Sequence, residues 1–207
     1  MPRPGLPALL GVVAVLSSSA AAGDSWVRVR SPHFEVLSDA GEAPAREAAR
    51  RLERLRGVLL QLFPAREGVE RPITLLVLEN RARFTSLVPR DSGRGAGLAG
   101  FFQGGTERDC AVLHLSSDQP RPFDAAEHEY AHLILNGSLP AQPVWVAEGL
   151  ADVLSGATLD GHEARLGAGR PEYEAILRER SSFSLEGLIA VDFDSPAYQD
   201  HAETEAL

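Results

Sequence analysis

Two histidines and a glutamate lie within five consecutive residues, His128-Glu129-Tyr130-Ala131-His132. Residues four positions apart share one face of a helix, so the imidazoles of His128 and His132 can reach one metal ion. Glu129 would be turned about 100° around the helix, toward a water molecule on that metal. The pattern H-E-x-x-H is therefore typical of a Zn²⁺ site with a general base beside it. The alternative is a solvated helix face that carries the pattern by chance.

Catalytic zinc takes three protein ligands and keeps one position open, so a third ligand is needed. Glu148 lies on a second predicted helix, after a Pro-containing turn long enough for the chain to fold back. Asp152 follows four residues later on the same helix face, where it could accept the free ring N–H of a ligating histidine. The alternative for Asp152 is an ordinary surface carboxylate. A closed structural site with four ligands would not require Glu129, so its presence favours catalysis.

Hydrophobic periodicity predicts the elements that must position these residues. The helix of the motif is expected to begin near Asp124, as N-cap with Glu127 three residues later, and to end near Asn136-Gly137. A strand over Ala111–Leu115 precedes it, and Trp145 is expected to pack in the core at the start of the Glu148 helix. Gly93, Gly95, Gly97 and Gly100 match no phosphate-binding fingerprint and predict a surface loop. The other predicted elements are strands at 33–38 and 73–78 and helices at 44–63, 81–87, 144–154, 171–180 and 185–190.

Composition indicates one soluble globular domain. The chain has 207 residues, of which 44% are hydrophobic and 24% are charged. The net charge of −9, with scattered arginines, argues against nucleic acid as a partner, because phosphate binding needs a clustered basic face.

The first 22 residues are expected to be a cleavable signal peptide. Arg3 supplies positive charge, residues 6–16 form a short apolar stretch, and Ala20-Ala21-Ala22 provides an A-x-A cleavage site before Gly23. The stretch is shorter than the roughly 20 residues that span a bilayer, so no stable membrane span is expected in the mature chain, 23–207. The alternative is an uncleaved anchor. Export to the periplasm or the extracellular space follows from the signal.

The motif residues resemble a known family. His128-Glu129-x-x-His132 followed by Trp145-Val146-Ala147-Glu148-Gly149-Leu150-Ala151 is similar to the gluzincin metallopeptidases, most closely the small exported bacterial peptidase-MA-like proteins. Residues 26–36 and 100–102 resemble the same family. The resemblance implies an α+β, zincin-like fold: a small mixed β-sheet backed by helices, with the H-E-x-x-H helix and the glutamate helix below a cleft. It also implies that His128, His132 and Glu148 bind Zn²⁺, that Glu129 is the general base, and that Asp152 supports a histidine.

The implied activity is hydrolysis of peptide bonds in a peptide or protein substrate. The strand at 111–115 is the expected edge along which an extended peptide would add. A further donor for the oxyanion is needed, and the downstream candidates are Tyr173, Tyr198, His162 and His201. Members of the family continue with an amphipathic helix past the position of Leu207, so the chain is expected to be truncated or a shortened variant with a partly open cleft. A zinc-holding but inactive domain that binds peptides or envelope partners is the alternative function.

Overall fold

The computed structural model describes residues 14–15, 26–64, 73–88, 100–103, 109–116, 121–160, 163–167, 171–179, 184–195 and 198. Its main sheet has the strand order β1-β2-β3-β4-β6-β5. These strands are β1 (Ala14–Val15), β2 (Val27–Arg30), β3 (Phe34–Ser38), β4 (Ile73–Leu78), β6 (Asp109–His114) and β5 (Gly100–Gln103). The sheet is mixed, because β3, β4 and β6 run parallel while the outer pairs are antiparallel. The α+β class with a mixed sheet is thus confirmed.

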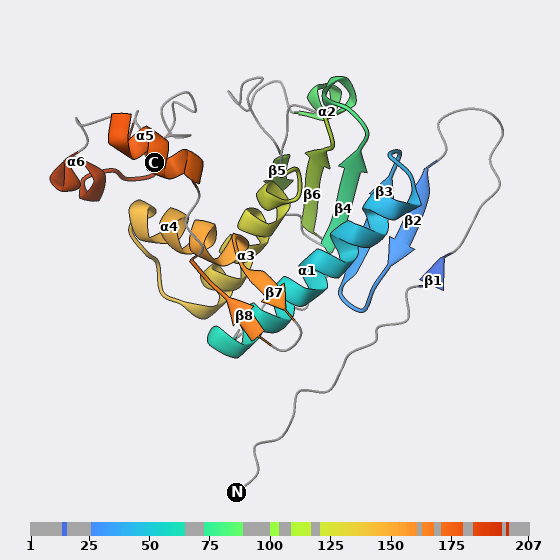
Figure 1. Cartoon of the computed structure of the whole chain (residues 1–207), viewed down its shortest axis with the longest axis horizontal. Helices are drawn as coiled ribbons and strands as arrows, with labels where there is room; N and C mark the ends of the chain where they lie inside the picture. The colour runs from blue at the N-terminus through green and yellow to red at the C-terminus, as the bar shows by residue number, and fades with distance from the viewer. Residues whose placement is uncertain are drawn as a thin grey trace, which may run out of the picture.

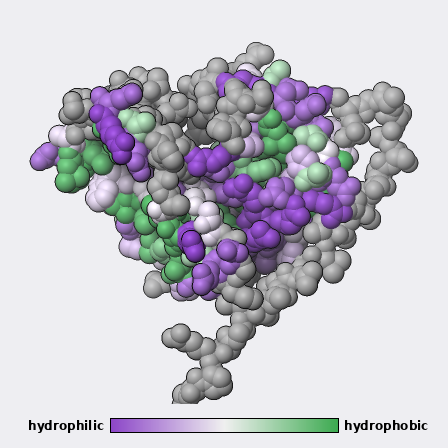
Figure 2. Space-filling view, in the orientation of Figure 1, coloured by the Kyte–Doolittle hydropathy of each residue, from purple (hydrophilic) through white to green (hydrophobic). Residues whose placement is uncertain are grey.

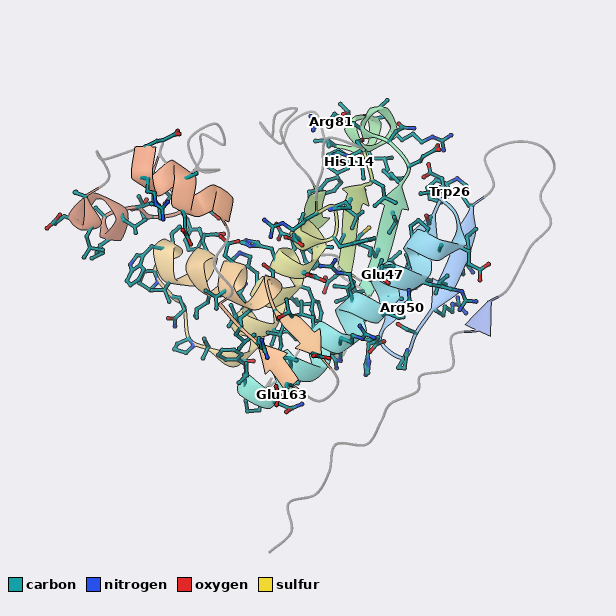
Figure 3. The ribbon with its side chains drawn as sticks, viewed as in Figure 1. Trp26, Glu47, Arg50, Arg81, His114 and Glu163 are labelled. Carbon is teal, nitrogen blue, oxygen red and sulfur yellow. The ribbon has the colours of Figure 1, made fainter. Side chains whose placement is uncertain are left out.

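The long helix α1 (Glu42–Leu62) covers one face of this sheet, and α3 (Asp124–Ser138) packs beside it (Figure 1). The apolar residues of α1 recur every three or four positions and are buried, whereas Glu47 and Arg50 pair on the outer face of this helix (Figure 3). This polar side of α1 forms a hydrophilic band in the space-filling view (Figure 2). The amphipathic pattern, which is local in the sequence, therefore determines which face of α1 packs against the sheet.

The central strand β4 is apolar except for Thr74, because both of its faces are covered. Leu75 and Val77 belong to the core under α1 and α3, while Leu78 packs on the other face against Phe84 of α2 (Arg81–Leu87). The strands predicted at 33–38 and 73–78 and the helices at 44–63 and 81–87 are confirmed within one or two residues at each end. The mostly apolar run at 73–78, interrupted only by Thr74, was the signal of a strand buried on both sides.

After α3 the chain forms α4 (Val144–Ser155), which packs on α3, and then a hairpin of β7 (Thr158–Asp160) and β8 (Glu163–Arg165). The helices α5 (Pro171–Glu179) and α6 (Leu185–Ile189) lie beyond α4 in Figure 1. The predicted helices at 144–154, 171–180 and 185–190 are confirmed, but β2, β5 and the β7–β8 hairpin were not predicted. No helix in the described part of the chain is long and apolar enough to cross a bilayer. Ala14–Val15, inside the predicted signal peptide, pair with β2.

Gly100 corrects the prediction of a glycine loop, because it is the first residue of β5. The rest of that predicted loop lies outside the described residues. A Cβ at position 100 would lie 2.8 Å from the carbonyl oxygen of Val112 and 3.2 Å from the Cβ of Ala125 in α3. Gly100 therefore allows β5 to approach both β6 and the start of the motif helix.

We expect Gly100→Ala to lower the free energy of unfolding by about 1–3 kcal/mol, because the new methyl group forces β5 away from β6 and α3. Gly57→Ala is the matched control: position 57 is exposed in α1, and a Cβ there would meet no atom within 4 Å. The control should raise the free energy of unfolding by about 0.5–1 kcal/mol. Urea denaturation of both variants measures the difference, and equal changes would contradict the close approach of β5 to α3.

Candidate metal centre

The two motif histidines lie on the face of α3 that turns away from the core. The opposite face is buried through Tyr130, Ala131 and Ile134, which leaves His128 and His132 partly exposed. Their Nε2 atoms are 2.9 Å apart, and their rings meet edge to face. The i, i+4 spacing thus brings two imidazole nitrogens to one point, as the sequence predicted.

Helix α4 brings Glu148 to that same point. Its Oε2 lies 3.1 Å from Nε2 of His128 and 3.2 Å from Nε2 of His132. Ligand atoms of a tetrahedral zinc ion, at about 2.0–2.1 Å from the metal, are about 3.3 Å apart. The three atoms are therefore spaced closely enough to be bridged by one ion, and these residues form a group that could hold a metal.

The donor chemistry of His128 also fits a metal ligand. Its Nδ1 lies 2.9 Å from Oδ1 of Asp152, which stands one turn after Glu148 on α4. In the neutral ring, the form that binds a metal, a proton on Nδ1 satisfies this contact and leaves a lone pair on Nε2, the atom that faces His132 and Glu148. The predicted proximity of Asp152 to a motif histidine is thus present in the structure.

Electrostatics in the site favour positive charge. Burial of the His128 ring opposes its protonation, but hydrogen bonds to Asp152 and Glu148 outweigh burial and raise its pKa to about 9. Burial raises the pKa of Glu148, but hydrogen bonds with His128 and His132 lower it by more. The pKa of Glu148 is therefore held well below its usual range. Two carboxylates around one imidazole create a negative potential that also attracts a metal cation.

Glu129 follows His128 on α3 and is partly exposed. Within the described residues its side chain makes no hydrogen bond or ion pair. The rotation of about 100° per residue separates its carboxylate from the line of the two histidines while keeping it on the accessible side of the helix. Glu129 thus has acceptor oxygens that no described side chain occupies.

Among the predicted oxyanion donors, Tyr198 is placed at the site. Its hydroxyl donates a 2.9 Å hydrogen bond to Oε1 of Glu148, the oxygen that does not face the histidines. The side chain of Tyr173 and the whole of His162 and His201 lie outside the described residues. Spacing alone could not have singled out Tyr198, because 50 residues separate it from Glu148.

The start of α3 differs from the prediction. The N-cap is Phe123, without a side-chain cap, and Asp124 is the first helical residue. Asp124 and Glu127 instead bind Arg51 of α1, with Nη2 of Arg51 2.9 Å from Oε2 of the buried Glu127. A charged hydrogen bond between two helices has thus replaced the local capping box, and it raises the pKa of Arg51.

A second contact between α1 and α3 is the 2.9 Å hydrogen bond that Arg56 donates to the hydroxyl of Tyr130. Together with the pairs of Arg51, it holds α3 against α1. Sequence reasoning missed this anchoring. The available signal was the two acidic residues in the first turn of α3, which the capping box explained equally well.

Two further predictions are wrong. The strand β6 is paired on both sides, by β4 and β5, so it cannot be the edge along which a peptide adds; the edge beside α3 is β5. Trp145 is 39% exposed rather than part of the core. Both errors have the same cause. The pairing of β5 with β6 and the orientation of α4, which exposes Trp145, depend on contacts between residues far apart in the sequence.

The described residues define a class: an α+β protein with a mixed sheet and a His–His–Glu group across two helices that could hold a metal ion. No protein-family model matches the chain. A comparison with curated proteins also found no match. The similarity to gluzincins therefore rests only on the motif residues and on residues 26–36 and 100–102.

Proposed function

We propose that the protein is an exported zinc-dependent peptidase of the gluzincin type. The observation that carries this proposal is the convergence of Nε2 of His128, Nε2 of His132 and Oε2 of Glu148, all within 3.2 Å of one another, beside Glu129. Two imidazoles and one carboxylate are a ligand set of catalytic zinc, which keeps a position open. The fit of the donor set, rather than the motif alone, supports zinc.

His128, His132 and Glu148 would hold the zinc ion, which would supply a Lewis acid for the substrate carbonyl and the attacking water. Glu129 would accept a proton from the attacking water as the new C–O bond forms, and then deliver it to the amine nitrogen as the C–N bond breaks. Asp152 would hold the ring of His128 in the tautomer with a free lone pair on Nε2. The outer edge of β5 has no partner among the described strands and contacts α3, so it is the place for an extended peptide to pair.

The test uses the full chain exported from a bacterial host. Amino-terminal sequencing checks cleavage before Gly23, elemental analysis measures zinc, and a broad peptide library measures hydrolysis. We expect one zinc ion per chain and cleavage that a chelator abolishes and added zinc restores. Stoichiometric zinc without any turnover would contradict the peptidase and support the inactive peptide- or envelope-binding domain. Protein without zinc would exclude both.

We expect Asp152→Ala to weaken zinc binding by about 10–100-fold, the usual effect of removing the hydrogen-bond partner of a ligating histidine. Asp152→Asn is the matched control, because its amide oxygen can still accept from Nδ1 of His128 and should preserve most of the affinity. Competition with a chromophoric chelator measures both dissociation constants. Unchanged affinity in Asp152→Ala would remove Asp152 from the site and return it to the surface-carboxylate interpretation.

A further inference from the structure

Tyr198 reaches the metal centre from the end of the described chain. After α6, two backbone hydrogen bonds join residues three positions apart. The N–H of Ser195 donates to the carbonyl of Asp192, and the N–H of Tyr198 donates to the carbonyl of Ser195. The ring of Phe193 packs edge to face on the ring of Tyr198, with centroids 5.4 Å apart. These contacts present the hydroxyl of Tyr198 to α4.

The two oxygens of Glu148 have different surroundings. Oε2 faces the Nε2 atoms of both histidines, while Oε1 accepts the 2.9 Å hydrogen bond from Tyr198. A carboxylate can bind a metal through one oxygen or both. A hydrogen bond on Oε1 stabilises the rotation in which Oε2 points at the histidine pair, and it competes with metal binding through Oε1.

We propose that Tyr198 is a positioning residue that orients Glu148 to bind the metal through Oε2 alone. The inference rests on the proposed zinc site and deepens it. Binding through one carboxylate oxygen and two imidazoles leaves a coordination position for water or substrate, which a catalytic site requires. Tyr198 is thereby part of the metal centre, although it lies far outside the motif.

Another role for the hydroxyl predicts a different result. If Tyr198 left Glu148 and bound only the oxyanion of the substrate, its removal would lower turnover without changing metal affinity. If Tyr198 served only to pack the segment against α4, its hydroxyl would matter for neither quantity, because the ring contact with Phe193 survives removal of the hydroxyl. Metal affinity therefore separates positioning from both other roles.

The test compares Tyr198→Phe with wild type and with Tyr130→Phe. The control makes the same chemical change on the core side of α3, where the hydroxyl accepts from Arg56 and has no contact with Glu148. We expect the zinc dissociation constant to rise about tenfold in Tyr198→Phe and to stay unchanged in Tyr130→Phe. Visible absorption of Co²⁺ in the site should weaken in Tyr198→Phe, because binding through both oxygens of Glu148 raises the coordination number.

Equal zinc affinity in Tyr198→Phe and wild type would overturn the inference and leave the proposed function intact. Failure of wild type to bind zinc would overturn the proposed function and this inference together. Circular dichroism and thermal melting of both variants confirm that the compared proteins are folded.

Discussion

Glu129→Gln is expected to lower kcat for peptide hydrolysis by about 10²–10⁴-fold, the usual contribution of a general base, while zinc content stays at one ion per chain. Glutamine has nearly the same shape, but its amide nitrogen and neutral oxygen cannot take a proton from water at neutral pH. Glu129 has no described partner whose loss would disturb the fold, so melting temperature should change little. The effect is therefore confined to the chemical step.

Glu47→Gln is the matched control for this experiment. Glu47 lies on the outer face of α1, where it pairs with Arg50 (Figure 3), and it is not one of the residues that could hold the metal. Its substitution should leave kcat, zinc content and melting temperature at wild-type values. Retention of wild-type turnover by Glu129→Gln would exclude Glu129 as the base and, with it, the mechanism proposed above.

His132→Ala is expected to weaken zinc binding by more than about 100-fold. This loss is larger than that expected for Asp152→Ala, which removes only a hydrogen-bond partner of a ligating histidine. The substitution leaves one imidazole and one carboxylate, too few to hold a zinc ion in a tetrahedral site. The stabilisation that zinc confers by binding only the folded chain should vanish as well, so added zinc should no longer raise the melting temperature.

His33→Ala provides the comparison for His132→Ala. His33 is exposed and bonds to Glu53 of α1, and no metal-binding group of the described residues includes it. Its removal should leave zinc affinity unchanged. Tight stoichiometric zinc in His132→Ala would show that the ion binds elsewhere on the chain and would remove the assignment of the site to α3 and α4.

Local patterns predicted the elements whose signal is strong and repeated. The apolar stripe of α1, the mostly apolar run of β4 and the spacing of His128 and His132 all depend on residues a few positions apart. The strands β2 and β5 and the β7–β8 hairpin were missed, because each has only three or four residues and is stable through pairing with a distant strand.

The sequence by itself determined that two imidazoles share one helix face with a glutamate between them, because helical geometry is local. It also indicated that Glu148 and Asp152 lie one turn apart on a following helix. Only the tertiary structure decided that Oε2 of Glu148 meets both histidines, that Tyr198 bonds its other oxygen, and that Arg51 anchors α3 to α1. Such contacts depend on how α1, α3, α4 and the segment after α6 pack, and packing is set by the whole core rather than by any short stretch of chain.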